Sequence, residues 1–585
     1  MDSTTDSNTV LSQLKQRLSA HLAVVYQDAD INALSEQLVA TLTINGGTLP
    51  PAPYTNLWHQ QDVFLITYAD SIEDPPQAPL ATLDDFLDRY LADTISSVHI
   101  LPFYPYSSDD GFAVIDYYQV NQSHGDWHHI QDLAGKYRIM ADVVINHCSS
   151  RSGWFENFKR DIDPGKDYFF TAEPTDDTSD VVRPRTHPLL REVQTVNGIK
   201  HVWCTFSHDQ VDFDFRNPQV LLEFVAIIKF YLDQGITVFR FDAVAFVWKQ
   251  SNTNCINLPQ THELIKVLRL LVEHYCPTAV IITETNVPSR QNLMYFGNAN
   301  EAHAIYNFSL PPLLLNTLIT GDCTHLKTWL MSLPPAQQGT TYFNFLASHD
   351  GIGLRPVEGL LSQNQTDELI NTMTRFGAKI SWRALKEGIN QPYEINITLF
   401  DALQGTSRGV DNFHVDRFIC AHAIMLAIEG IPAIYLHSFL ATSNDYERVK
   451  HSGQNRAINR HKWHYPTLKQ RLDEPFSEQH KVLSRLKYLI SIRKQQVAFH
   501  PNATQFTLHL GTKLFAFWRQ SLNRQQSIFA INNISDQPQM LRLSDINLIE
   551  GQIWVDLISG YEFSDLYQTI TLAPYQSIWL SNQKI

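Results

Sequence analysis

Residues 235–244 read GITVFRFDAV, and this stretch decides the fold more than any other part of the chain. Its β-branched and aromatic residues form one apolar run, which is typical of a parallel strand buried on both faces. Within the run, Arg240 and Asp242 are two residues apart and therefore lie on the same face of the strand. Because a buried charge is costly unless it is paired or functional, the stretch predicts a strand that delivers a charged pair to a site.

Seven further runs are of the same kind, and polar residues end three of them: His147 in DVVINH, Glu284 in VIITETN and His349–Asp350 in FLASHD. Helical patterns separate many of the runs; one opens at Asn217–Pro218 and can be closed by Gly235. Eight strands with intervening helices predict an α/β fold, a (β/α)8 barrel whose active site lies where the strands end. The runs are VFLITYA, SVHILPF, IMADVVINH, TVFRFDAV, AVIITET, AIYNFSLP, TYFNFLASH and GIPAIYL.

The pattern outside the strands predicts three regions. Residues 1–57 carry helical periodicity and then a Pro/Gly-rich break, which predicts an N-terminal helical extension before a catalytic barrel over residues 58–502. Two polar connections, residues 150–205 and 354–410, follow the third and seventh strands and are long enough to be subdomains or lids over the active face. Short alternating strands over residues 503–585 predict a C-terminal antiparallel β domain.

Composition excludes several functional classes. The net charge of −15 argues against binding to nucleic acid or to an anionic membrane, so an anionic substrate needs a local cationic pocket. No apolar run is long enough to span a membrane, and the polar N-terminus has no secretory pattern. The six scattered cysteines are typical of reduced thiols in a cytoplasmic protein. WHHIQD and HKWH lack a third ligand, so we expect no metal, and no cofactor motif is present.

The charged strand ends favour retaining glycosyl transfer, which needs a nucleophilic carboxylate and a second carboxyl that acts as acid and then as base. Asp242 is the candidate nucleophile, because Arg240 would keep its carboxylate ionised and oriented. Glu284 is the candidate acid/base, since burial after AVIIT should raise its pKa. Asp350 could bind sugar hydroxyls and stabilise the transition state, whereas Asp142 lies too early in its run and is expected to be structural. Two histidines suited to hydroxyl recognition flank these carboxylates: His147 and His349.

In this order the motifs DVVINH, GITVFRFDAV, ITETN and FLASHD resemble those of the α-amylase superfamily, glycoside hydrolase family 13. The resemblance covers nearly everything after about residue 60. It implies Asp242 as the nucleophile, Glu284 as the acid/base and Asp350 as the transition-state stabiliser. It also implies that the flanking residues lie beside them: Arg240, His147 and His349.

Two more segments resemble the sucrose phosphorylase branch of that superfamily: LPFYPYSSDDGFAVIDY and GQNRAINRHKW. The resemblance implies that Asp109 and Arg460 grip a glucose hydroxyl and that Phe112 forms an aromatic platform for the sugar. Phosphorylases use phosphate in place of water, so a cationic pocket must face the glycosyl-enzyme. The segment VVRPRTHPLL supplies Arg183 and Arg185, and the resemblance puts Arg185 at the phosphate.

Two departures from sucrose phosphorylases put sucrose in doubt as the donor. Asn286 stands where a histidine usually follows the acid/base, and in PYEIN the residue after Tyr393 is Glu394 instead of the usual glutamine. ETNVP, PYEIN and the helical extension resemble glucosylglycerate phosphorylases more closely. That resemblance implies reversible phosphorolysis of 2-O-α-glucosylglycerate to α-glucose 1-phosphate and glycerate, with inorganic phosphate as co-substrate.

Several alternatives stay open. The donor could instead be sucrose, sucrose 6′-phosphate or glucosylglycerol. A retaining α-glucosidase or transglucosidase would carry the same three carboxylates, and only the acceptor pocket separates it from a phosphorylase. A non-catalytic sugar-binding protein predicts a missing carboxylate, and none is missing. The N-terminal extension could pack on the barrel or mediate a homodimer.

Overall fold

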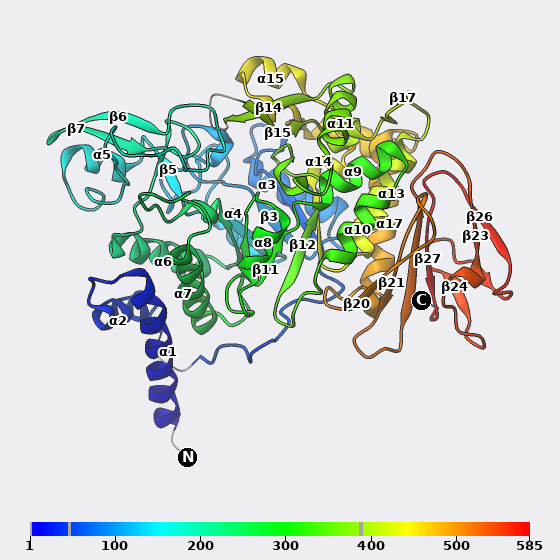
Figure 1. Cartoon of the computed structure of the whole chain (residues 1–585), viewed down its shortest axis with the longest axis horizontal. Coiled ribbons are helices and arrows are strands. Elements are labelled where there is room, and N and C mark those ends of the chain that lie inside the picture. Colours follow the sequence, from blue (N-terminus) through cyan, green and yellow to red (C-terminus); the bar gives the residue numbers. More distant parts are fainter. Residues whose placement is uncertain (1–2, 45–47, 385–389, 585) are drawn as a thin grey trace.

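The computed structural model describes residues 3–44, 48–384 and 390–584, and its centre is a closed parallel barrel of eight strands (Figure 1). Neighbours around the barrel are consecutive in the chain, and each of the eight predicted runs supplies one strand. The predicted (β/α)8 barrel is therefore confirmed. Its strands are β1 Phe64–Thr67, β3 Ser97–Ile100, β4 Arg138–Val144, β9 Ile236–Asp242, β10 Val280–Thr283, β11 Ala304–Tyr306, β12 Thr341–Phe345 and β18 Ile431–Tyr435.

Helices cover the outside of the barrel, and α6 shows how the sequence builds them. The Asn217 side chain accepts a hydrogen bond from the Gln219 N–H, and Pro218 occupies the first turn. Val220, Phe224 and similar residues are buried against the strands, where each contributes about 1.5–3 kcal/mol. The main helices are α3 Pro79–Tyr90, α4 Trp127–Ala134, α6 Pro218–Asp233, α7 Pro259–Tyr275, α9 Leu310–Thr320, α10 Thr324–Ser332, α13 His414–Ala427, α16 Tyr465–Asp473 and α17 Glu478–Lys494.

The N-terminal extension forms two helices, α1 Ser3–Val25 and α2 Ile31–Thr41, which lie against α7 and α6 (Figure 1). In α1 the buried leucines recur every four residues, as an amphipathic helix requires: Leu14, Leu18 and Leu22. His21 Nδ1 lies 2.6 Å from Glu263 Oε2 of α7. The extension therefore packs on the barrel, while the homodimer stays a prediction.

Two insertions follow barrel strands at their carboxyl ends. The first contains α5 Gly153–Arg160 and a hairpin of β6 Leu190–Thr195 and β7 Gly198–Trp203. The second contains α11 Gln363–Arg375 and a three-stranded sheet of β13 Ile352–Gly353, β14 Lys379–Ala384 and β15 Asn390–Asn396. Both lie along the upper edge of the molecule in Figure 1.

Short elements lie between the main strands and helices. Three two-stranded sheets pair segments near strand ends, namely β2 Ile72–Glu73 with β19 Trp463–His464, β5 His147–Ser149 with β8 Gln210–Asp212, and β16 Gly405–Thr406 with β17 Gly409–Val410. Short helical turns are η1 Asp109–Gly111, η2 Val244–Phe246, α8 Ser289–Asn292, η3 Leu293–Phe296, η4 Arg355–Val357, α12 Leu399–Ala402, α14 Leu436–Phe439, α15 Tyr446–Ser452, η6 Asn455–Asn459 and η7 Val497–Phe499.

The C-terminal region is an antiparallel β domain, as predicted. Its main sheet has the order β20-β21-β22-β27-β24-β25, and β23 pairs separately with β26. Arg519 of β21 donates a 2.6 Å hydrogen bond to the carbonyl of Ala427, which ties the domain to the barrel. The strands are β20 Thr504–Leu508, β21 Leu514–Gln520, β22 Ser527–Asn533, β23 Gln539–Arg542, β24 Trp554–Asp556, β25 Glu562–Phe563, β26 Thr569–Leu572 and β27 Ser577–Ser581, with η8 Leu543–Asp545 between them.

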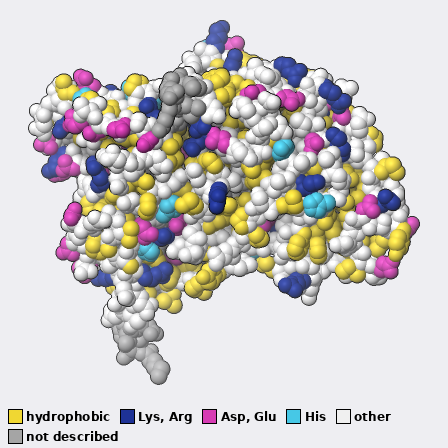
Figure 2. Space-filling view, in the orientation of Figure 1, with side chains coloured by type: hydrophobic (Ala, Val, Ile, Leu, Met, Phe, Trp, Pro, Cys, Tyr) yellow, Lys and Arg dark blue, Asp and Glu magenta, His cyan; other side chains and the backbone are white. Residues whose placement is uncertain are grey.

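On the face shown in Figure 2, Lys and Arg side chains are scattered among Asp and Glu and form no basic stripe. This distribution agrees with the acidic net charge. Within the described ranges, no helix has both the length and the apolar character needed to cross a bilayer. All six cysteines are free thiols.

Candidate active site

The three expected catalytic carboxylates line one pocket at the carboxyl ends of the strands. Asp242 is the last residue of β9, Glu284 follows β10 directly, and Asp350 lies five residues beyond β12. The pocket holds about 640 Å³ of empty space, part of it open to solvent, and all three residues are part of its wall. Residues far apart in the chain thus meet because parallel strands end on the same face of a barrel.

Arg240 holds the carboxylates in place. Its Nη1 lies 2.7 Å from Asp242 Oδ1 and also contacts Asp142, which stands beside Arg240 in the register of β4 and β9. Its Nη2 is 4.0 Å from Glu284 Oε2. The other Asp142 oxygen lies 2.7 Å from His99 Nε2. Asp142 therefore neutralises charge on the buried guanidinium of Arg240, as expected of a structural residue.

Ala243 links the nucleophile candidate to the acid/base candidate. Directly after Asp242 it adopts a left-handed backbone conformation with φ of 50°, which costs a non-glycine residue about 1–2 kcal/mol. Its N–H donates a 3.0 Å hydrogen bond to Glu284 Oε2. The backbone after the β9 strand end therefore fixes one oxygen of Glu284.

Burial raises the pKa of Glu284, as expected from its apolar strand. Burial also raises the pKa of Asp242 well above its usual range, and the Glu284 carboxylate raises it further, although Arg240 opposes both effects. Desolvation is the largest of these effects, and the ionisation of Asp242 by Arg240 stays a prediction. We expect the two carboxyls to hold one proton between them, and the direct contact to Arg240 favours its position on Glu284.

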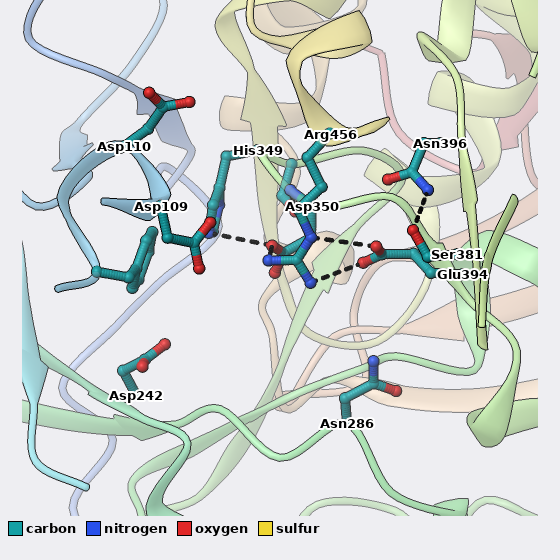
Figure 3. Close-up of polar contacts among 12 residues, drawn as sticks. Asp109, Asp110, Asp242, Asn286, His349, Asp350, Ser381, Glu394, Asn396 and Arg456 are labelled. Carbon is teal, nitrogen blue, oxygen red and sulfur yellow. Dashed lines mark hydrogen bonds and ion pairs between the residues drawn. The ribbon is translucent and has the colours of Figure 1, made fainter. Parts of the chain in front are cut away.

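Asp350 is different, because a second arginine keeps it ionised. Burial raises its pKa, but Arg456 and the neighbouring cationic groups more than reverse this and hold the pKa below its usual range. Arg456 Nη1 lies 2.6 Å from Asp350 Oδ1, and the same guanidinium bonds both oxygens of Glu394 at 3.0 and 3.1 Å (Figure 3). Sequence reasoning missed Arg456, although it stands in the segment GQNRAINRHKW, four residues before Arg460.

Three of the residues expected to recognise sugar line the pocket together: Phe112, His147 and His349. The ring of Phe112 is stacked on that of His349, with centroids 4.8 Å apart and planes 7° apart. His147 Nε2 donates to the Phe112 carbonyl at 3.1 Å. Burial lowers the pKa of His147 to about 4 and that of His349 well below its usual range, so both rings are neutral, as a hydroxyl-binding role requires.

Asp109 and Arg460, which were predicted to act as a pair, do not both reach the pocket. Asp109 lines the pocket, whereas Arg460 is fully buried behind it and donates from Nε to the His349 carbonyl at 2.9 Å. Its Nη1 is 2.9 Å from Asp110 Oδ2 but 3.6 Å from Asp109 Oδ1. Arg460 is thus placed to position His349 and the Asp109 turn, and only Asp109 is placed to touch a sugar directly.

Of the two arginines predicted to bind phosphate, Arg183 and Arg185, only Arg185 lines the pocket. Its guanidinium lies 5.4 Å from the ring of Tyr393 and 5.7 Å from that of Phe206. Arg183 instead donates to the carbonyl of His187, within its own loop. The structure therefore supports a substrate-binding position for Arg185 and a loop-bracing position for Arg183.

The two positions that depart from sucrose phosphorylases have different surroundings. Asn286 lines the pocket, and its Nδ2 donates to the Tyr393 hydroxyl at 3.3 Å. Glu394 is buried beside the pocket and bonded to Arg456, so it acts on the site through that arginine. A side chain at Gly351 would bring Cβ to 2.6 Å from the Glu394 Cγ, so the close approach of these loops requires glycine there.

Arg355 is a second pocket residue that sequence reasoning missed. It belongs to the short turn η4, and it lines the same pocket as Tyr393 and Arg185. Only 8% of the residue is exposed, and burial lowers the pKa of its guanidinium. Its only sequence signal is its place five residues after Asp350 in HDGIGLRP.

A buried ammonium group fills the polar cluster behind His147. Lys249 Nζ lies 2.8 Å from Asn146 Oδ1 and 2.9 Å from Asp212 Oδ2. Among the described residues, no group of three or more His, Cys, Asp or Glu side chains is arranged to hold a metal ion. The expectation that the protein needs no metal stays a prediction.

Comparisons with known proteins agree with this geometry. The α-amylase catalytic-domain model matches residues 85–366, and the maltogenic amylase C-terminal domain model matches residues 505–579. The glucosylglycerate phosphorylase of Escherichia coli (strain K12) is 39% identical over 97% of this chain and 100% of its own length. That of Allomeiothermus silvanus is 37% identical over 98% of this chain and 100% of its own.

More distant relatives share the fold. The sucrose phosphorylase of Streptococcus mutans is 30% identical over 74% of this chain and 88% of its own length. The crystal structure of sucrose 6F-phosphate phosphorylase from Thermoanaerobacter thermosaccharolyticum superposes with a TM-score of 0.72 at 24% identity, and covers 89% of this chain and 100% of that one.

Proposed function

Since the chain belongs to the α-amylase superfamily, in the branch that holds the sucrose and glucosylglycerate phosphorylases, we propose that it is a retaining glucoside phosphorylase. Its reaction is the reversible phosphorolysis of 2-O-α-glucosylglycerate to α-glucose 1-phosphate and glycerate. The observation that carries this proposal is a pocket that joins the carboxylates Asp242, Glu284 and Asp350 to the guanidinium of Arg185. The full-length similarity to glucosylglycerate phosphorylases supports the choice of aglycone.

In the first step an Asp242 oxygen attacks the anomeric carbon while Glu284 gives its proton to the glycosidic oxygen. The bond to the aglycone breaks, and glycerate leaves from a glucosyl-Asp242 intermediate. The ionised Asp350 faces the sugar and stabilises the positive charge that develops on its ring, and Arg456 keeps that carboxylate ionised. Arg240 orients the attacking oxygen through its 2.7 Å contact.

In the second step phosphate enters the space left by glycerate. A phosphate oxygen attacks the anomeric carbon from the same face, and Glu284, now a carboxylate, accepts the proton of the incoming group. The bond to Asp242 breaks, so the product is α-glucose 1-phosphate with retained configuration. Arg185 is placed to hold the phosphate, because its guanidinium faces the pocket and, among the described residues, makes a hydrogen bond only to the carbonyl of Pro184.

The reverse reaction tests the proposed function. α-Glucose 1-phosphate is supplied separately with glycerate, glycerol, fructose and fructose 6-phosphate, and the release of phosphate is measured for each. We expect glycerate to be the best acceptor. A preference for fructose or glycerol would move the aglycone to one of the alternatives, and formation of free glucose alone from glucosylglycerate at saturating phosphate would show a hydrolase.

Arg185→Ala should lower phosphorolysis about 10- to 100-fold, as the loss of a charge-assisted hydrogen bond worth about 1.5–3 kcal/mol implies. Hydrolysis of the same donor without phosphate should change much less, since water needs no cation. Arg183→Ala is the matched control, because that side chain lies in the same loop but bonds to His187 instead of facing the pocket. Equal losses of both activities in Arg185→Ala would argue against a phosphate-binding role.

We further propose that the enzyme works in the cytoplasm and uses phosphate as its only co-substrate, with no cofactor or metal. The six free thiols support a reducing compartment. A homodimer remains a prediction, and sedimentation of the full chain would test it.

A further inference from the structure

The arginines at the pocket differ in whether a carboxylate of the protein is paired with them. Arg240 is paired with Asp142 and Asp242, and Arg456 is paired with Asp350 and Glu394. Each of these guanidinium groups therefore faces at least two carboxylates. Two other arginines of the pocket wall, Arg185 and Arg355, stand at its acceptor end. Within the part of the chain that the structure describes, neither is paired with a carboxylate.

Arg355 is the more deeply buried of these two. Its Nε has no hydrogen-bond partner among the described residues and no exposure to solvent. The carboxylate next to it in the chain, Glu358, is held by Arg383 Nη2 at 2.6 Å. A buried, unpaired guanidinium is costly, and that cost is recovered when an anion binds. The pocket wall therefore contains a guanidinium that no carboxylate of the described residues neutralises.

The backbone around Arg355 is fixed, so this side chain does not owe its position to a loose loop. The Leu354 N–H donates to the Tyr393 carbonyl at 3.0 Å, and the Glu358 N–H donates to the Arg355 carbonyl at 3.1 Å. The Ser309 hydroxyl donates to the Pro356 carbonyl at 3.0 Å. These bonds anchor both sides of the turn to the barrel and to β15.

A second polar group without a hydrogen-bond partner lies at the same end of the pocket, and this one is a hydrogen-bond acceptor. Asn286 donates from Nδ2 to the Tyr393 hydroxyl, but its buried Oδ1 accepts no hydrogen bond from any described residue. A Cβ atom built at Gly353, two residues before Arg355, would lie 3.0 Å from the amide of Asn286. The acceptor end thus offers a cation and a hydrogen-bond acceptor close together, which match a carboxylate and a hydroxyl on one small molecule.

We propose that Arg355 recognises the anionic group in the acceptor subsite, and that it thereby selects anionic acceptors over neutral polyols and sugars. It pairs with the carboxylate of the departing or incoming hydroxy acid, and with the phosphate that takes the same place after that acid leaves. The Asn286 oxygen accepts a hydrogen bond from a hydroxyl of the hydroxy acid. This inference rests on the proposed function, because both anions occupy the space beside the glucosyl-enzyme.

A donor without an anionic leaving group isolates the acceptor subsite. α-Glucosyl fluoride forms the glucosyl-enzyme, which is then offered glycerol in competition with either glycerate or phosphate, and the products are quantified. In Arg355→Gln we expect the ratio of anionic to neutral product to fall about 10- to 100-fold relative to the wild type. Arg375→Gln is the matched control, since Arg375 bonds Thr372 and Ser407 outside the pocket, and it should leave the ratio unchanged.

Arg355→Lys keeps the charge without the planar fork and should retain more of the preference than Arg355→Gln. It also gives a reading if the glutamine variant does not fold. A fall with glycerate alone assigns Arg355 to the carboxylate, and a fall with both anions assigns it to both; either result supports the proposal. Unchanged ratios in folded Arg355→Gln and Arg355→Lys would overturn it.

The same experiment separates this inference from the proposed function. If the wild type transfers glucose to phosphate but not to glycerate, the proposed aglycone is wrong, and the ratio of phosphate to glycerol products still decides the role of Arg355. If the wild type transfers glucose to neither anion, the phosphorylase function and this inference fail together.

Discussion

Replacement of Asp242 by asparagine is expected to reduce turnover of every donor by about 10⁴-fold or more, the scale seen when a covalent nucleophile is removed. The amide is nearly the same size as the carboxylate but cannot attack the anomeric carbon. Arg240 keeps its contact with Asp142, so its charge stays balanced and the barrel should fold normally. Residual turnover is measured with glucosylglycerate and with α-glucosyl fluoride, because the second donor needs no acid catalyst.

Two readouts separate loss of chemistry from loss of fold. The thermal unfolding midpoint of Asp242→Asn should stay close to that of the wild type. After brief incubation with α-glucosyl fluoride, mass spectrometry should find a glucosyl group on the peptide that contains Asp242 in the wild type and none in the variant. Undiminished turnover in Asp242→Asn would exclude Asp242 as the nucleophile.

Glu284→Gln should reduce phosphorolysis of the glucoside by about 10²- to 10⁴-fold, because the leaving oxygen then receives no proton. Formation of the glucosyl-enzyme from α-glucosyl fluoride should be affected far less, since fluoride departs without a proton. The comparison is made by the rate of fluoride release against the rate of glycerate release. Equal losses with both donors would contradict the assignment of Glu284 as the acid.

The pH dependence gives a second test of Glu284. Its acid form is required, and burial raises its pKa, so kcat/KM for the glucoside should fall as the pH rises through that raised pKa and the shared proton is lost. At lower pH, kcat/KM should fall again when the pair of carboxyls takes up a second proton and Asp242 is no longer a carboxylate. In Glu284→Gln the alkaline fall should disappear while the acid fall remains, and a persistent alkaline fall would show that another group is responsible.

Glu429 offers the matched control for this profile. It is a buried glutamate whose pKa is raised to about 7 by burial, and it accepts a hydrogen bond from the Ala336 N–H at 2.7 Å. It lies just before β18, at the end of the barrel away from the pocket. Glu429→Gln should therefore leave the pH profile of kcat/KM unchanged.

The barrel and its three carboxylates could be predicted from the sequence because both depend on local patterns. A parallel strand covered on both faces is a continuous apolar run, and GITVFRFDAV shows such a run with its charged pair. The strand ends meet by the geometry of the fold, so Asp242, Glu284 and Asp350 could be placed together without coordinates. The sequence also predicted the C-terminal sheet and the helix that begins at Pro218.

Only the tertiary structure decided which arginines serve the pocket. Arg183 and Arg185 look alike in sequence, yet one bonds within its loop and the other faces the pocket. Arg460 was expected at the sugar and lies behind it, while Arg456 and Arg355 were not expected and line the wall. The reason is physical: an arginine is free to pair with an anionic ligand where no carboxylate already neutralises it, as at Arg185 and Arg355. Those carboxylates come from distant parts of the chain, and their pairing leaves no periodicity in the sequence.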